Sequence, residues 1–386
     1  MPIVNRIADF HPDLTRWRRE LHAHPETAFE EHRTSDFVAA RLEEFGLKVH
    51  RGLAGTGLVA SLEGKRSGSH TIALRADMDA LDVAERNHFD HASQNPGKMH
   101  ACGHDGHTTM LLGAARYLAE TRNFAGTVRF IFQPAEENEG GGRVMIEEGL
   151  FEKFPAEAVF GMHNWPGLPT GTFAVREGPI LAAFDIFELT VKGKGSHAAM
   201  PHLGVDPVVA AAQIVSALQT IASRMVSPLD SAVVTVTQIH GGDTWNVIPD
   251  EVVLRGTCRS FKPEVQAATE TAIRRIAEGV AGALGASVEM RYERRYPPTV
   301  NSAAETILAA DTAADIVGES KVNRDATPSM GAEDVAFMLG EKPGCYILVG
   351  NGEDAANLHN PHYDFNDEIL PLGASYWARL VERVLV

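Results

Sequence analysis

Four short apolar runs, rich in β-branched residues, alternate along the chain with longer segments that have the spacing of amphipathic helices. Such runs predict strands buried on both faces. Their alternation with helices predicts an α/β fold, with a mostly parallel sheet covered by helices on both faces. Because the carboxyl ends of parallel strands meet at one edge of a sheet, the polar residues that follow the runs are expected to share one site. The runs are 71–75, 127–132, 158–162 and 346–349, followed by Asp77 and Asp79, Glu136 and Glu137, His163, and His359, and helices are expected over about 106–121 and 142–152.

The middle of the chain follows a different order of expected elements. Two helix-like segments lie among four strand-like segments in the order βαββαβ, which is that of the ferredoxin-like fold. Gly-Pro and Pro-Pro pairs flank this stretch at 178–179 and 297–298. We therefore expect an inserted domain over 184–296 and a discontinuous catalytic domain over 1–183 and 297–386. The expected strands are 187–191, 232–236, 251–254 and 287–292, and the expected helices are 208–221 and 265–280.

Length and charge limit the class of protein. A chain of 386 residues has room for about two or three domains. Its 35 basic and 51 acidic residues give a net charge of −16, which argues against a nucleic-acid partner because phosphate binding needs basic patches. Apolar runs stay short of the roughly 20 residues of a membrane helix, and the amino terminus lacks the apolar core of a signal peptide. No membrane partner and a cytoplasmic location are therefore expected.

Cysteine and histidine are distributed unevenly along the chain. The three cysteines are odd in number and far apart, so neither a disulfide framework nor an iron–sulfur cluster is expected. Segment 99–107 holds three histidines, a cysteine and an aspartate within nine residues. Cys102 and His104, two residues apart, can point the same way and bind one ion or a close pair. A buried thiol beside a capping histidine is the alternative, and the density of ligand side chains favours the metal.

Glu136 and Glu137 are adjacent, so their side chains diverge and are unsuited to equivalent roles on one ion. One carboxylate can hold a metal while its neighbour faces the activated water as a general base. A solvated acidic loop is the alternative, since Glu139 follows. The apolar strand expected before the pair favours a functional role.

The candidate site residues and several motifs together resemble, over essentially the whole chain, the metal-dependent aminoacylase and carboxypeptidase family of amidohydrolases. The resemblance is closest to the branch that contains hippurate hydrolases, auxin amino-acid conjugate hydrolases and bacterial N-acyl-amino-acid amidohydrolases. The motifs that carry it are HAHPE at 22–26, RADMDAL at 75–81, HACGHDGH at 100–107, FQPAEE at 132–137, GSHAAMPH at 195–202, NVIP at 246–249 and MGAED at 330–334.

The resemblance implies a dinuclear site for two divalent ions, Zn, Mn or Co, with Glu136 as general acid/base. Asp79 would then orient a ligand histidine. Peptidase branches place a His-x-Asp pair where this chain has Asp77 and Asp79, which favours the amidohydrolase branch. Within that branch Asp82 replaces a usual proline, and the stretch 83–95 is atypical. The implied metal ligands are Cys102, His104, Glu137, His163 and His359.

For the inserted domain the resemblance implies dimer contacts and substrate binding, so a homodimer or a higher homo-oligomer is expected. His197 matches the histidine that reaches into the partner subunit's site and polarises the scissile carbonyl. Asn246 and Arg259 match positions that contact the substrate carboxylate. Without the resemblance, His197 would be interpreted as an exposed turn residue and Arg259 as a solvated charge at a strand end.

The function that follows is hydrolysis of the amide bond of N-acyl amino acids, such as hippurate-like, N-acetyl or indole-acetyl conjugates, to a carboxylic acid and a free amino acid. A metallo-dipeptidase or carboxypeptidase of the same family is one alternative. A dinuclear phosphoesterase is disfavoured, because no basic cluster surrounds the ligand segments. A non-catalytic, metal-dependent binding protein is disfavoured by the intact pair of Glu136 and Glu137, because binding alone needs no free carboxylate.

Overall fold

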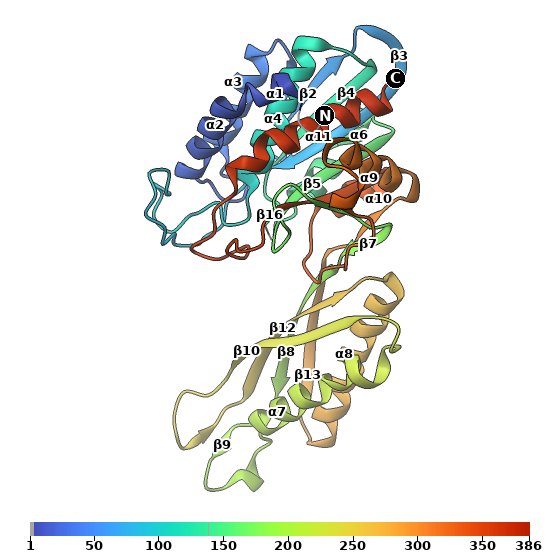
Figure 1. Cartoon of the computed structure of the whole chain (residues 1–386). Helices are drawn as coiled ribbons and strands as arrows, with labels where there is room; N and C mark the ends of the chain where they lie inside the picture. Colours follow the sequence, from blue (N-terminus) through green and yellow to red (C-terminus); the bar gives the residue numbers. More distant parts are fainter. Residues whose placement is uncertain (1–3, 138) are drawn as a thin grey trace. The chain divides into compact units, whose positions relative to one another are not determined.

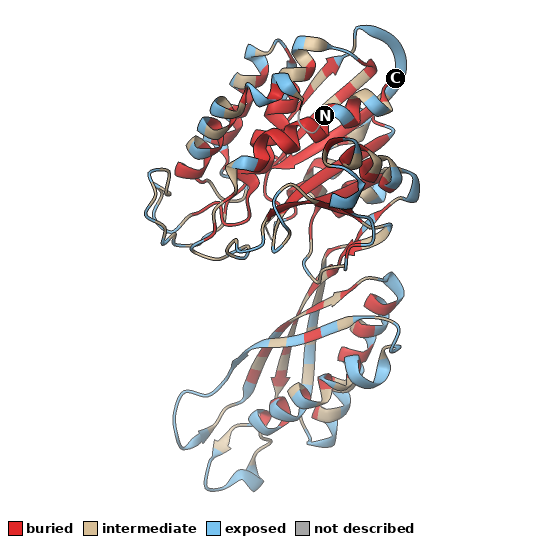
Figure 2. Ribbon diagram, in the orientation of Figure 1, coloured by how far each residue is buried: buried red, intermediate tan, exposed pale blue. Residues whose placement is uncertain are grey.

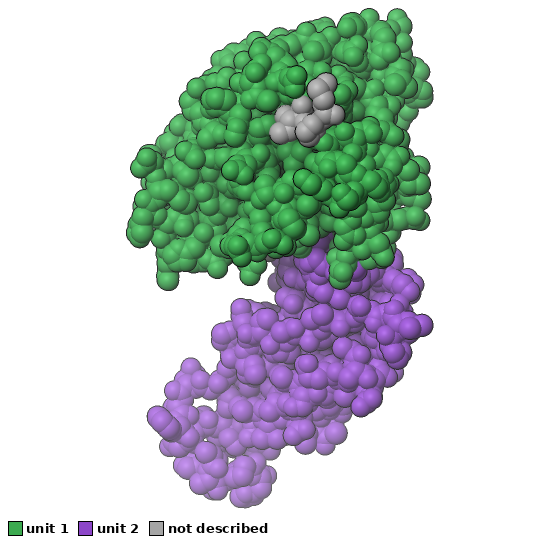
Figure 3. All heavy atoms as spheres, in the orientation of Figure 1, with its two compact units in different colours: residues 1–180, 300–327, 334–386 green, residues 181–299, 328–333 purple. Residues whose placement is uncertain are grey.

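The computed structural model describes residues 4–137 and 139–386. They form two compact units, coloured separately in Figure 3: unit 1 comprises residues up to 180, 300–327 and 334–386, and unit 2 comprises 181–299 and 328–333. The chain passes between the units along β7 (Gly178–Leu181) and β14 (Thr299–Asn301). Segment 328–333, which we had expected in the catalytic domain, groups with unit 2. The backbone N–H of Ala182 donates to the carbonyls of Ser329 and Gly331.

Unit 1 is built on an eight-stranded sheet in the order β1-β2-β4-β3-β5-β16-β6-β15 (Figure 1). The four predicted strands are its adjacent central strands β4, β3, β5 and β16, which pair in parallel. The mostly parallel α/β class is thus confirmed, with antiparallel pairs confined to the flanks. The bounds are β1 Lys48–Leu53, β2 Gly57–Glu63, β3 Arg66–Asp77, β4 Ala125–Gln133, β5 Ala158–Pro166, β6 Phe173–Ala174, β15 Val322–Asn323 and β16 Gly344–Gly352.

Helices cover both faces of this sheet because neighbouring residues of each central strand are buried on opposite sides. Leu74 of β3 packs with α1–α4, α9 and α11, whereas Ala73 packs with α5, α6 and α10. Figure 2 colours these strands and the helix sides that face them as buried. The bounds are α1 Asn5–Ala8, α2 His11–Ala23, α3 His32–Glu44, α4 His104–Thr121, α5 Gly141–Glu147, α6 Leu150–Lys153, α9 Ala303–Val317, α10 Val335–Glu341 and α11 Leu370–Val384, with short 3₁₀ turns at Glu319–Lys321 and Asp367–Ile369.

Two local sequence predictions for unit 1 were wrong. The single helix expected over 142–152 is two short helices, α5 and α6, because Gly149 between them adopts a left-handed backbone with φ +87°. The strand expected to end before His163 continues past it, since β5 extends to Pro166.

Unit 2 has the predicted βαββαβ order and a core of its own. Its sheet, β10-β12-β8-β13, is antiparallel throughout, as the ferredoxin-like fold requires. Two further short strands, β9 (Ser196–His197) and β11 (Val247–Ile248), pair with each other. The other bounds are β8 Ala183–Lys192, a 3₁₀ turn at Pro201–Leu203, α7 Pro207–Leu218, a π-helical turn at Ile221–Met225, β10 Ala232–His240, β12 Glu251–Ser260, α8 Pro263–Ala283 and β13 Ser287–Tyr296.

One helical stretch of unit 2, Pro207–Met225, is an exception to the expected absence of long apolar runs. By length and composition alone it could cross a membrane. This is weak evidence, because the core helix of a soluble protein passes the same test. Its side chains at Ala210, Ile214 and Leu218 pack in the core of unit 2.

Two helix glycines make a matched test of this packing. A Cβ at Gly106 in α4 would lie 2.2 Å from the ring of Phe365, so Gly106→Ala should lower the free energy of unfolding by about 1–3 kcal/mol. A Cβ at Gly279 in α8 would meet nothing within 4 Å, so Gly279→Ala should raise it by up to about 1 kcal/mol. Urea unfolding followed by circular dichroism measures both, and shifts of the same sign would contradict the packing.

Candidate dinuclear metal centre

The carboxyl edge of the central strands brings all five implied metal ligands together. Cys102 precedes α4 and His104 begins it, Glu137 follows β4, His163 lies in β5, and His359 follows β16. The structure groups ligand atoms that lie within 4.8 Å of one another into overlapping sets. Three of these sets contain the implied ligands and Glu136: Cys102 with His104 and His163, Cys102 with Glu137 and His359, and His104 with Glu136 and Glu137.

Individual distances show how tightly the donors gather. Cys102 Sγ lies 3.4 Å from His163 Nε2, and His359 Nε2 lies 3.2 Å from Glu137 Oε1. His104 Nε2 is buried and has no hydrogen-bond partner among the residues described. A cation held between these donors would satisfy that nitrogen, so the residues present fit a metal. Their mixture of sulfur, nitrogen and oxygen suits Zn, Mn or Co.

The charges around the site favour a positive ion. Burial alone would lower the pKa of His104, but Asp77 and Asp79 outweigh it and raise that pKa to about 10. A hydrogen bond with Glu137 raises the pKa of His359. Burial lowers the pKa of His163 well below its ordinary value, so this imidazole is neutral and offers a lone pair. The site thus combines acidic surroundings with a neutral nitrogen ligand, which is what a divalent cation requires.

Asp79 holds two of the candidate ligands in place. Its Oδ1 lies 3.1 Å from His104 Nδ1, and its Oδ2 accepts the backbone N–H of Glu137 at 2.9 Å. A carboxylate on the remote nitrogen of a ligand histidine fixes the orientation of the ring and leaves Nε2 for the metal. This geometry agrees with the orienting role that the resemblance implies for Asp79.

A third buried histidine, His107, lies in the same cluster as His104 and His163 and was missed as a site residue. His107 Nδ1 lies 2.7 Å from Asp77 Oδ1, and the backbone N–H of Asn164, next to His163, donates to His107 Nε2 at 3.0 Å. His107 lies one helical turn after His104, on the same side of α4. The i, i+3 spacing within the HACGHDGH motif was the available signal.

The backbone is strained at two points beside the ligands. Ala135, just before the glutamate pair, has φ +53°, and His359 has φ +62°. Left-handed backbone at residues other than glycine persists only where surrounding contacts enforce it. At Ala135 the contact is Glu31, a buried residue that accepts the backbone N–H of Ala135 at 2.9 Å and the hydroxyl of Thr56 at 2.6 Å. No pattern near residue 136 points to Glu31.

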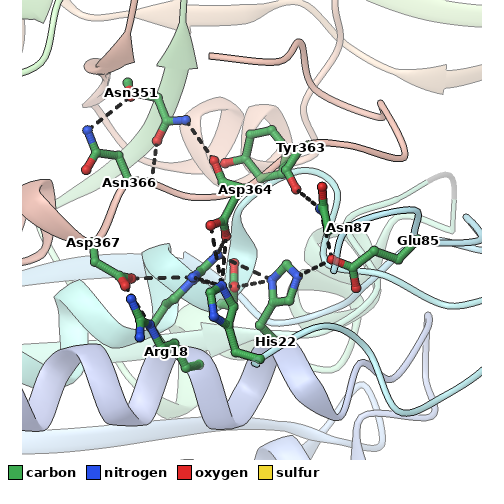
Figure 4. A network of polar contacts seen from close by, with 12 residues as sticks. Arg18, His22, Glu85, Asn87, Asn351, Tyr363, Asp364, Asn366 and Asp367 are labelled. Atoms are coloured by element: carbon green, nitrogen blue, oxygen red, sulfur yellow. Dashed lines mark hydrogen bonds and ion pairs between the residues drawn. The ribbon is translucent and has the colours of Figure 1, made fainter. Parts of the chain in front are cut away.

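A buried network centred on Arg18 ties together the loops that carry the ligands (Figure 4). Arg18 Nε donates to Asp105, next to His104, at 2.9 Å, and a second nitrogen donates to Asp364 in the loop after His359. His22 lies between Asp105, at 2.9 Å, and Glu85, at 3.2 Å. The network therefore fixes the start of α4 relative to the segment that supplies His359.

The atypical stretch 83–95 belongs to this network. Its Arg86 N–H donates to the carbonyl of Pro361 at 2.9 Å, and the amide of Asn87 donates to the carbonyl of Tyr363 at 3.0 Å. The stretch thus lies against the His359 loop and supports it.

In unit 2 the structure brings two of the expected residues together and separates the third. His197 pairs with Val247, and the N–H of Ala198 donates to the carbonyl of Asn246 at 2.9 Å. Asp250, just before β12, accepts the backbone N–H groups of the residues before and after Lys194. These hydrogen bonds place the short β9–β11 sheet beyond the Glu251 end of β12. Arg259 lies at the other end, eight residues further along at about 3.3 Å each, or about 26 Å away.

Arg259 is held there by its own contacts. Its guanidinium lies 3.9 Å from the centre of the Phe184 ring, and its Nε donates to the carbonyl of Met330 at 3.2 Å. Within one chain, therefore, Arg259 lies too far from Asn246 and His197 for all three to contact one small group.

Comparison with known proteins identifies the class. Residues 73–383 match the sequence pattern of Peptidase family M20/M25/M40. The chain therefore belongs to this family and is a hydrolase that acts on amide bonds, which confirms the predicted family.

Three proteins show how close the similarity is. An N-acetylcysteine deacetylase of Bacillus subtilis (strain 168) is 41% identical over 379 residues, which cover 97% of this chain and 98% of that protein. A hippurate hydrolase of Campylobacter jejuni is 38% identical over 385 residues and 100% of both chains. A solved Bacillus subtilis structure, described as a dinuclear metal-binding peptidase of the M20 family, is 37% identical with a TM-score of 0.86, over 98% of this chain and 99% of that one.

The carboxyl group of Glu31 generates a prediction about pH. Burial raises its pKa from 4.5 to about 7. The folded state therefore holds this proton more tightly than the unfolded state, and the stabilisation present below pH 4.5 is lost as the pH rises to about 7. Glu31→Gln cannot ionise, so it should gain stability relative to the wild type across this window.

Urea unfolding over the same pH range measures the effect, with Glu30→Gln as the control. Glu30 is exposed, and its hydrogen bond with Lys98 lowers its pKa, so its replacement should give no such gain. Unfolding free energies of wild type and Glu31→Gln that stay parallel from pH 4.5 to 7 would show that Glu31 is not held neutral.

Proposed function

We propose that the protein hydrolyses the amide bond of N-acyl amino acids at a dinuclear metal centre, releasing a carboxylic acid and a free amino acid. The observation that carries the proposal is the convergence of five donor side chains beside Glu136, whose carboxylate lies 3.9 Å from His104 Nε2. The printed activities of the deacetylase and hippurate hydrolase relatives are of this kind, and they support the choice of N-acyl amino acids over dipeptides.

In this proposal two divalent ions, Zn, Mn or Co, supply Lewis-acid activation of water and of the scissile carbonyl. Their ligands would be the five residues of the candidate centre. Neutral His163 and the Cys102 thiolate provide the softer donors, and Glu137 provides an oxygen. Asp79 keeps His104 oriented for binding throughout the cycle.

Glu136 moves the protons. It is 5% exposed, lies beside the ligands, and directly follows Ala135, whose backbone is strained. Its carboxylate takes a proton from the attacking water and later delivers it to the leaving amine, so one group acts first as base and then as acid. Because Glu137 is turned toward His359, the two adjacent glutamates have separate roles.

The proposal further requires two chains for each complete site. In one chain about 26 Å of strand β12 separates Arg259 from the Glu251 end, beyond which His197 and Asn246 lie, and this is farther than an N-acyl amino acid reaches. If all three contact one substrate, the pair comes from a second copy. β10 is an end strand whose outer edge pairs with no other described strand. That edge, with exposed Val233 and Ile239, and the exposed valines Val208 and Val209 of α7 offer unit 2 a surface for that copy.

Substitution of the two glutamates separates catalysis from metal binding. Glu136→Gln should keep its metal and lose about 10²–10⁴-fold in turnover, because both proton transfers depend on the carboxylate. Glu137→Gln should lose metal instead. Metal analysis and hydrolysis of acetyl-, benzoyl- and indole-acetyl-amino acids, with dipeptides as the control panel, measure both effects. Hydrolysis of dipeptides without hydrolysis of any N-acyl amino acid would contradict the proposed substrate class. If Glu136→Gln loses metal while Glu137→Gln keeps it, the two glutamates have the opposite roles.

Mixing two inactive variants tests the two-chain site. His197→Ala and Glu136→Gln should each be nearly inactive. In a heterodimer one site combines Glu136 from the first chain with His197 from the second, and random pairing makes about half the dimers of this kind, so about a quarter of wild-type activity should return. A mixture that demonstrably exchanges subunits yet stays inactive would show that His197 does not act across chains.

A further inference from the structure

Unit 1 carries a polar pocket away from the metal centre, lined by residues of β1, β2 and β4 and of the end of α6. We propose that this pocket, which has a volume of about 530 Å³, binds the phosphate group of a small molecule. The side chains that the argument uses are Lys48, His50, Ser61, Arg122, Arg129 and Lys153.

The sheet register places a cation on each side of a hydroxyl. Lys48 of β1 pairs with Ser61 of β2, and Ser61 pairs with Arg129 of β4, so the three side chains form one row on one face. Neighbouring strands are about 4.8 Å apart, so Lys48 and Arg129 start about 10 Å apart, and both are long enough to converge above Ser61. Arg129 already donates to the Ser61 hydroxyl, which leaves the hydroxyl proton to donate to an anion.

Among the described residues, the cationic side chains of this pocket have no acidic partner that would neutralise their charge. In the part of the chain that the structure describes, no carboxylate lies within ion-pair distance of Lys48, Arg122, Arg129 or Lys153. Glu63 is the one acidic side chain among the described lining residues, and it attracts Arg129 without forming an ion pair. Gathering like charges that have no acidic partner costs free energy unless an anion joins them.

Arg129 supplies the second indication. Its Nε is shielded from water and has no hydrogen-bond partner among the described residues, and burial lowers its pKa. A buried guanidinium N–H without an acceptor costs free energy that an oxyanion would recover, and a guanidinium fork matches the geometry of phosphate.

Two rings at the mouth of the pocket bear on what the phosphate is attached to. The centres of the His50 and Phe154 rings lie 5.1 Å apart and their planes are tilted by 54°, so each ring offers an aromatic face of its own among the lining residues. Free phosphate has no ring that could pack against these side chains, whereas the base of a nucleotide could stack on one of them. The shared chemistry is the phosphate, and the choice between these two sources is left to the experiment.

The pocket is separate from the candidate metal centre. None of its lining residues is a candidate metal ligand. Arg129 precedes Gln133, the last residue of β4, by four residues, or about 13 Å along the strand, and the glutamate pair lies beyond that end. Binding at the pocket can therefore be distinguished from binding of phosphate to metal.

Isothermal titration of the metal-loaded protein with inorganic phosphate, and separately with AMP, tests the proposal. Lys48→Met and Arg129→Met should each weaken binding about tenfold, because each removes one charge-assisted contact. Lys321→Met removes an exposed cation elsewhere on unit 1 and should leave binding unchanged. Any phosphate bound at the metal centre is common to all four proteins and cancels. AMP binding tighter than phosphate binding identifies a nucleotide-like ligand, and equal affinities identify phosphate itself.

Lys48 is exposed, so Lys48→Met tests the pocket even if Arg129→Met fails to fold. Equal dissociation constants for wild type and Lys48→Met would overturn the proposal. A loss of affinity in Lys321→Met as large as that in Lys48→Met would also overturn it, because binding would then follow net charge. A third contradicting result would be that all saturable phosphate binding disappears when the metal is stripped from the protein.

Discussion

Unit 1 depends above all on compensation of carboxylates that are buried away from water. Arg18 and Arg75 are the buried arginines among the described residues, and each holds more than one acid. Arg75 donates to Asp77 at 2.7 Å and to Asp334 at 3.0 Å, which joins β3 to the segment before α10. An ion pair of this kind adds little net stability over an apolar pair of the same shape. Removing one partner, however, leaves an uncompensated buried charge and lowers the free energy of unfolding by about 3–5 kcal/mol. These arginines therefore fix where the segments lie.

The same compensation is incomplete at the candidate metal centre. Among the described residues, no lysine or arginine lies within ion-pair distance of Asp79 or Glu137, and histidines lie beside them instead. Bound cations would complete the balance, so metal binding and the stability of this edge of the sheet are linked by mass action. The strained backbone of Ala135 and His359 is held by hydrogen bonds, because Glu31 accepts the N–H of Ala135 and the carbonyl of Ala101 accepts the N–H of His359.

Much of the fold and site could be predicted because their signals are local. Runs such as 71–75 and 127–132 are apolar on both faces, which marks central strands, and the polar residues after them mark the edge where ligands gather. The break at Gly149 was missed because a single glycine is tolerated within a helix at a cost of about 1 kcal/mol, so it does not by itself mark a helix end. Glu31 and Arg18 were missed because their partners, Ala135 and Asp364, are more than 100 residues away and no spacing rule connects them. The separation of Arg259 from Asn246 follows from strand direction, which short motifs do not encode.

The position of β16 in the sheet has a consequence for synthesis on the ribosome. β16 lies between β5 and β6, yet almost 180 residues, from Pro166 to Gly344, separate it from β5 in the chain. Unit 2 shortens that path, because Phe184 at its start pairs with Tyr296 at its end, so an early-folding insertion brings the two halves of unit 1 back together at little entropic cost. Until β16 emerges, the edge of β5 is unpaired and His359 is absent. The nascent chain therefore gains a complete set of metal ligands only after His359 has been added, long after the other four ligands.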